Sequence, residues 1–73
     1  MQKIDISQII IPDNFKNNLP STSKLASKYG LYKMTHELRD SIIIDENGIL
    51  INGYITYLLA KMLDINILSV EII

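Results

Sequence analysis

The sequence predicts a small α+β domain in which two or three helices pack against a mixed sheet. Strand-like and helix-like patterns alternate along the chain, and an Asn-Gly turn joins two aliphatic runs into a hairpin. A chain of 73 residues has room for one core only, so residues 1–73 are expected to form a single domain. The expected order of elements is strand, helix, hairpin, helix and strand.

The first expected element is a strand over residues 3–6, where polar and apolar side chains alternate. Pro12 has no backbone N–H, so strand pairing should end there. Residues 13–14 have the composition of a turn, and Phe15, the single phenylalanine of the chain, is expected to anchor the core.

A short helix is predicted over about residues 21–29. The hydroxyl of Ser21 or Thr22 can accept a hydrogen bond from the free amide groups at its start. Gly30 is expected to end the helix, because glycine adopts the left-handed conformation of a C-cap without steric cost. Residues 31–40 fit neither the helical nor the strand pattern and are predicted to be a loop with a short strand.

A β-hairpin is predicted over residues 41–44 and 49–51, two aliphatic runs separated by the turn residues 45–48. The turn contains Asn-Gly, the strongest short-range hairpin signal, because both residues tolerate positive φ. Strands that are apolar throughout are typical of burial on both faces, or of one face against helices and the other against a neighbour.

A second helix is predicted over residues 54–63, directly after Gly53. Helical spacing places four apolar residues on one stripe, namely Ile55, Leu58, Leu59 and Met62. Tyr57 and Lys61 then lie on the opposite side, with Tyr54 beside them. Two rings and a cation on an exposed stripe favour contact with a protein partner or stacking of bases, and the simpler alternative is a solvated helix face.

The last expected element is a strand over residues 67–73, after a helix end at residues 64–66. Leu68, Val70 and Ile72 alternate with polar residues, which is the pattern of a strand with one buried face. This strand completes the predicted mixed sheet.

The composition indicates that the domain needs support beyond its own core. Cysteine is absent, so disulfides and thiolate metal sites are excluded. Hydrophobic residues make up 48% of the chain, more than one small core is expected to cover. A homo-oligomer or a complex with a protein partner is therefore predicted.

The charge balance argues against direct binding to nucleic acid. Seven Lys and Arg residues stand against eight Asp and Glu residues, which gives a formal charge of −1. No apolar run approaches the roughly 20 residues that cross a bilayer, and the first residues lack the features of a signal peptide. A cytoplasmic protein without membrane contact is expected.

Several short motifs together resemble the ParB/sulfiredoxin-like domain family. They comprise a strand ending in L-I-x-G-Y, a helix carrying Y-x-x-A-K, and an alternating final strand. The matching segments are residues 42–45, 49–54, 57–61 and 68–72, with the opening strand and Ile11, Pro12 and Phe15 after it. The resemblance covers most of the chain and implies a small mixed sheet with helices, as the patterns do.

The chain also departs from the family pattern at its functional positions. Active members carry G-x-x-R after the strand and use that arginine on nucleotide phosphates, whereas counting from Gly53 places Thr56 at this position. The sulfiredoxin branch needs a cysteine, and this chain has none. The resemblance therefore implies a reduced member that is not an enzyme and requires no cofactor.

The junction at Gly53 has two interpretations. The structural one is that glycine permits a backbone geometry that other residues resist and lets strand and helix pack closely. The functional one is a weak anion site at Gly53, Tyr54, Ile55 and Thr56, since a helix N-terminus presents free amides and a partial positive charge. No basic side chain follows the glycine in the next three residues.

No metal site is expected. His36 is the single histidine, and Glu37 and Asp40 near it supply too few ligands for the three or four that a site requires. A loop histidine is the preferred interpretation.

These observations predict a non-catalytic ParB-like interaction module that associates with itself or with a protein partner. One alternative is a weak nucleotide or phosphate binder at the Gly53 turn. Another, which follows only from the family resemblance, is a DNA-associated accessory protein of a plasmid or phage segment. Ligand identity, partner and pathway are left open by the sequence.

Overall fold

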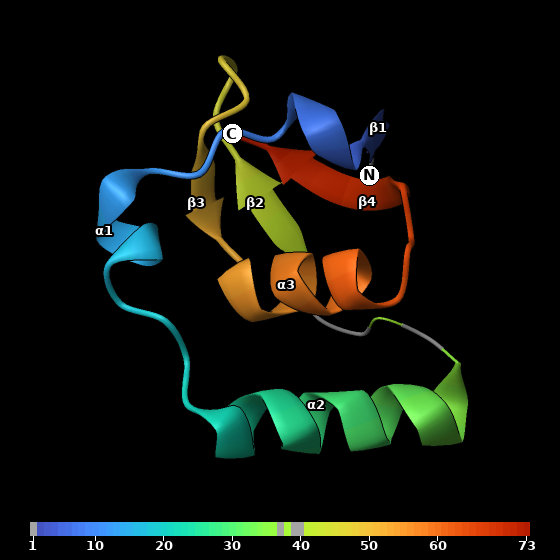
Figure 1. Ribbon diagram of the computed structural model, residues 1–73. Helices are drawn as coiled ribbons and strands as arrows, with labels where there is room; N and C mark the ends of the chain where they lie inside the picture. Colours follow the sequence, from blue (N-terminus) through green and yellow to red (C-terminus); the bar gives the residue numbers. More distant parts are fainter. Residues whose placement is uncertain (1, 37, 39–40) are drawn as a thin grey trace.

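The computed structural model describes residues 2–36, 38 and 41–73 and confirms the α+β class (Figure 1). Three helices and a 3-10 turn accompany a four-stranded sheet. In chain order the elements are β1 (Gln2–Asp5), η1 (Ile6–Gln8), α1 (Asp13–Lys16), α2 (Thr22–Thr35), β2 (Ile42–Ile44), β3 (Leu50–Asn52), α3 (Tyr54–Met62) and β4 (Ile67–Ile72).

The sheet is mixed, as predicted, with the strand order β1-β4-β2-β3. β1 pairs with β4 and β2 pairs with β3 in antiparallel fashion, whereas β2 and β4 run parallel. Parallel strands need a crossover connection, and here the connection passes through β3 and α3. Figure 1 shows α3 beside the sheet and α2 on the far side of α3.

The hairpin between β2 and β3 is confirmed and owes its turn to local hydrogen bonds. Asp45 Oδ1 accepts from the backbone N–H of Asn47 and of Ile49, each at 2.9 Å. Gly48 adopts φ 86°, where a Cβ would lie 2.9 Å from the carbonyl oxygen of Gln8. Gly48 therefore permits both the turn and its close approach to Gln8 of η1.

The core lies between one face of the sheet and α3. Ile42 and Val70 are paired on adjacent strands and are 1% and 0% exposed. The alternation of β4 is confirmed at Leu68 and Val70, but the prediction for Ile72 is wrong, because this last residue of the strand is 43% exposed. The end of β4 has less cover than its centre.

The segment after β1 is held by its own caps. The Asp5 side chain accepts from the backbone N–H and the hydroxyl of Ser7, at 2.9 and 2.8 Å, and these bonds lower the pKa of Asp5. Ile10 then bridges to Ile49, covering part of the β3 edge. Pro12 ends this pairing, as expected.

The turn predicted at residues 13–14 is instead the first turn of α1. Asp13 lies there, where a negative charge favours the start of a helix, and the N–H of Asn17 donates to its carbonyl oxygen at 2.8 Å. Phe15 is partly buried and packs against the core cluster, in line with its expected anchoring role.

Helix α2 is longer than predicted. Ser21 is the N-cap, and its hydroxyl accepts from the N–H of Lys24 at 3.3 Å. Gly30 does not end the helix, which continues to Thr35 and is capped by His36 at φ 57°. The loop prediction is therefore wrong over residues 31–35. A single glycine weakens a helix without breaking it, so the flanking residues carry α2 through. Residues 37 and 39–40 lie outside the described part of the chain.

The exposed and buried sides of α3 also differ from the prediction. Tyr57, expected on the exposed side, is 9% exposed, whereas Met62, expected on the buried stripe, is 63% exposed. The buried residues of the helix are Thr56, Tyr57, Leu59 and Ala60. Because α3 lies between the sheet and α2, it buries residues on two sides, and a one-sided pattern does not describe it.

Candidate functional site

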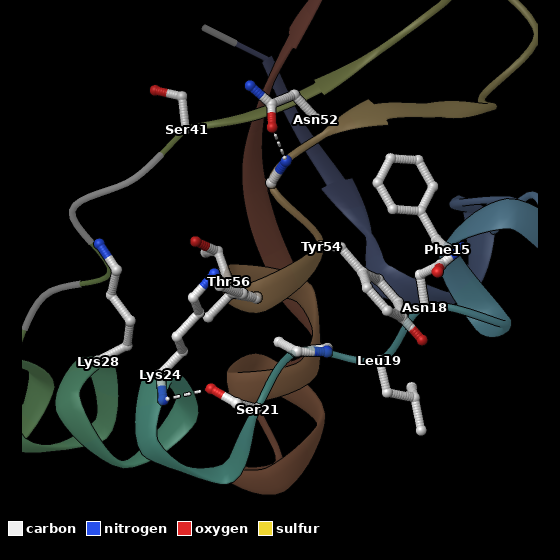
Figure 2. Close-up of a pocket in the computed structure, with 13 residues that line it drawn as sticks. Phe15, Asn18, Leu19, Ser21, Lys24, Lys28, Ser41, Asn52, Tyr54 and Thr56 are labelled. Carbon is white, nitrogen blue, oxygen red and sulfur yellow. Dashed lines mark hydrogen bonds between the residues drawn. The ribbon is translucent and has the colours of Figure 1, made fainter.

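A groove of about 720 Å³ opens between α2, the segment after α1, and the junction of β3 with α3 (Figure 2). Its volume lies within the range of about 300–1,000 Å³ that is typical of small-molecule pockets. One end is lined by lysine, serine, threonine and backbone amides, and the other by Phe15, Leu19 and Pro20. The groove thus has a polar, cationic end and an apolar end.

Gly53 is required by the backbone at the polar end. It adopts φ 96° as the N-cap of α3, and a Cβ built on it would lie 2.9 Å from both Ile42 Cα and the carbonyl oxygen of Ser41. Asn52 Oδ1 accepts from the N–H of Gly53 at 2.9 Å. No side chain caps the helix beyond this, so the first amides of α3 are left for other acceptors.

Two lysines of α2 supply the cations that the sequence near Gly53 lacks. Lys24 and Lys28 both line the groove, and Figure 2 shows the side chain of Lys24 rising from α2 to a position beside Thr56, whereas that of Lys28 rises farther from the start of α3. None of the described residues that line the groove is acidic. Lys28 also interacts elsewhere within the chain.

No basic side chain follows Gly53 in the next three residues of the sequence, but the packing of α2 brings Lys24 and Lys28 into the lining of the same groove. The four-residue spacing of Lys24 and Lys28 places them on the same helix face, which could have been read from the sequence. Their approach to Gly53 depends on how α2 packs against α3, which local patterns do not specify.

Thr56, at the position of the family's arginine, is the buried polar residue of this site. It is 6% exposed and lines the groove. Its hydroxyl makes no hydrogen bond to another described residue, and Thr56 also lines a second pocket, beside Tyr32 and Leu68. Figure 2 places it between Lys24 and Asn52. The hydroxyl is thus available to a ligand.

Tyr54, Tyr57 and Lys61 do not form the exposed stripe that was expected. The ring of Tyr54 lies 5.4 Å from that of Phe15 and 6.1 Å from that of Tyr57, and Lys61 Nζ lies 5.6 Å from the Tyr57 ring. The contact between Phe15 and Tyr54 joins α1 to α3, and Tyr54 has an aromatic neighbour on each of two sides. A role in partner contact remains a prediction, and of these three residues only Lys61 is exposed.

His36 lies at the end of α2, where its ring contacts the edge of Tyr32 at 6.3 Å. Glu37 and Asp40 fall outside the described residues, as does Arg39. Among the residues that are described, no group of three or more His, Cys, Asp and Glu side chains converges. Within the same residues, no helix has both the length and the apolar character needed to span a membrane.

Comparison with known proteins identifies the fold. No protein-family model matches the chain, and neither does the sequence of any curated protein. Two solved structures of a pNOB8-like ParB N-domain superpose on 97% of the chain, with TM-scores of 0.79 and 0.77 and sequence identities of 21% and 20%. The chain therefore has the fold of a ParB N-domain and spans 28% and 26% of the length of those two chains.

Proposed function

We propose that the chain is a non-catalytic, cytoplasmic, ParB-like binding module whose groove takes a phosphate-bearing small molecule such as a nucleotide. The observation that carries this proposal is the direction of Lys24 toward the uncapped start of α3, in a groove that Lys28 also lines. Free amides and the helix dipole attract an anion from one side, and the two ammonium groups attract it from the other.

Each polar group at this end of the groove has a distinct role in the proposed complex. The first amides of α3 donate to phosphate oxygens, and the Thr56 hydroxyl adds a donor from the floor. Asn52 accepts from Gly53 through Oδ1, so its Nδ2 hydrogens are directed away from that bond and can donate to the ligand. The set is rich in donors, which suits an anion.

The composition of the groove supports binding over catalysis. Nucleophilic catalysis requires a hydroxyl beside a base that is itself oriented by a third group. Ser21, Ser41 and Thr56 supply hydroxyls, but none of the described lining residues is a histidine or a carboxylate. Ser21 is already used as the N-cap of α2.

The test is isothermal titration of the protein with inorganic phosphate, pyrophosphate and ribonucleoside mono- and triphosphates. Lys24→Ala should weaken binding by at least about tenfold, because a hydrogen bond to a charged group contributes about 1.5–3 kcal/mol. Asn52→Asp should weaken it further, since it keeps the acceptor for Gly53 but adds a negative charge to the groove.

The matched control is Lys33→Ala, which removes the same charge from α2. Lys33 Nζ lies 5.6 Å from the Tyr29 ring, and the residue does not line the groove. Its affinity should stay within about twofold of the original. Absence of heat with every ligand at millimolar concentration, or equal losses in Lys24→Ala and Lys33→Ala, would reject the proposed site.

A second candidate function, self-association, is favoured by the outer face of α2. An exposed helix normally turns charged residues to solvent, but this face carries Gly30, Met34 and small residues, with Leu31 at its margin. Met34 is 81% and Leu31 is 44% exposed. Lys33 lies at the opposite margin, and the largely uncharged surface between Leu31 and Lys33 is compatible with a second copy of itself, which a two-fold dimer requires.

Sedimentation velocity at rising protein concentration checks the second candidate. The unaltered protein should sediment faster above about 100 μM as it associates weakly, consistent with a small interface. Met34→Glu should remain monomeric, whereas Met62→Glu, a change at an exposed methionine of α3, should associate as before. A monomer at all concentrations contradicts self-association without affecting the groove.

A further inference from the structure

We infer that α2 acts as a flap over the groove, loosely held in the free protein and locked onto α3 by the bound phosphate. This inference rests on the proposed function and adds to it a conformational consequence of binding. It follows from how α2 is packed and from how the groove is divided between α2 and α3.

Helix α2 is weakly held in the fold. Its 14 residues include none that is buried, whereas the 9 residues of α3 include four. Leu25, Tyr29 and Tyr32 are only half-buried on the side facing α3. Isolated helices of this length are marginal in water and depend on packing for their stability, so α2 is expected to open before the sheet does.

Gly30 weakens α2 further. It occupies the interior of the helix, and a Cβ built there would meet nothing within 4 Å. No close contact within the described structure therefore accounts for a glycine at this position. Glycine lowers helix stability relative to alanine, and that cost falls on the element with the least burial.

The ligand contacts are divided between the flap and the rest of the domain. Lys24 and Lys28 belong to α2, whereas Asn52, the Gly53 turn and Thr56 belong to the β3–α3 junction. Opening of α2 removes both lysines and leaves only the junction. A phosphate in the groove therefore binds the closed form more tightly and shifts the population toward it.

The size of the effect follows from linkage. If a ligand binds only the closed form, ten times its dissociation constant reduces the open population by about tenfold. Backbone amides of α2 that exchange through opening should then exchange about tenfold more slowly. Amides of β4, in the centre of the sheet, exchange through rarer openings of the whole domain, so in the free protein they should exchange more slowly than those of α2.

Hydrogen–deuterium exchange with pyrophosphate at ten times its calorimetric dissociation constant tests the flap. About tenfold protection of residues 22–35, reduced to about twofold or less in Lys24→Ala at the same pyrophosphate concentration, is the expected result. Calorimetric binding without added protection of α2 overturns the inference and leaves the proposed function intact. No binding by calorimetry removes both.

A glycine substitution tests the weakness of the flap without any ligand. Gly30→Ala should slow exchange of the α2 amides about fivefold, the factor that corresponds to the roughly 1 kcal/mol propensity difference between the two residues. The amides of β2 and β4, which exchange through opening of the whole domain, should slow by no more than the same factor. Unchanged exchange in α2 would mean that the helix is held by something other than its own propensity and would contradict the flap.

Discussion

Gly53→Ala is expected to destabilise the fold by about 3 kcal/mol or more, since it combines a strained backbone with a steric conflict. The residue adopts φ 96°, and the new Cβ would lie 2.9 Å from two backbone atoms, Ile42 Cα and the Ser41 carbonyl oxygen. Backbone atoms of a central strand cannot move aside as a flexible side chain can. Domains of this size have a total stability of roughly 4–11 kcal/mol, so a large part of it would be lost.

Urea unfolding followed by circular dichroism measures this effect, and Gly30→Ala is its matched control. Both variants add one methyl group at a glycine, but Gly30 is helical and has open space around it. Gly30→Ala should raise the free energy of unfolding by up to about 1 kcal/mol. Opposite signs are expected, and equal shifts of the two midpoints would contradict the described geometry at Gly53.

Leu50→Ala is expected to lower the free energy of unfolding by about 2–5 kcal/mol, the usual range for a leucine removed from a packed core. Leu50 is 2% exposed and belongs to the core cluster with Ile42 and Val70. The lost methyl groups leave a cavity between α3 and the sheet, and a chain this short has few other buried side chains to compensate.

Ile51→Ala is the control, because Ile51 directly follows Leu50 in β3. Its side chain points to the other face of the sheet and is 44% exposed, so the expected loss is below about 1 kcal/mol. The same urea series serves for both variants. A loss at position 51 as large as that at position 50 would mean that the outer face of the sheet is covered, by a second copy for instance.

The elements that local chemistry specifies were predictable from the sequence. The hairpin depends on Gly48, whose tolerance of positive φ is a property of the residue itself, whereas Asn47 does not adopt positive φ. The alternation in β4 follows from the two-residue period of a strand and is confirmed at Leu68 and Val70. The fold class required no more than these patterns and their order.

Errors arose where packing overrides a local signal. Gly30 can end a helix, but here the chain continues as helix to Thr35 because one glycine costs less than the remaining turns contribute. Tyr57 is buried because it belongs to the core cluster, together with residues of the sheet. No periodicity within α3 reports a neighbour that comes from another part of the chain.

The candidate site divides in the same way. The Gly53 turn was predictable, since a glycine between a strand and a helix is a local feature. That Lys24 and Lys28 line the same groove as this turn was not, because it depends on how α2 packs against α3. Anion binding at the turn could therefore be proposed only once the structure had placed these two lysines in the same groove.

The most direct test of the proposed anion groove is a nuclear magnetic resonance titration with pyrophosphate at constant ionic strength. The backbone amide signals of Tyr54, Ile55 and Thr56 should move together with those around Lys24, and the same signals should stay in place in Asn52→Asp. The contradicting result would be movement of the signals of exposed lysines only, with the amides at the start of α3 unchanged. This holds for pyrophosphate up to about 20 mM, a 20-fold excess over roughly 1 mM protein.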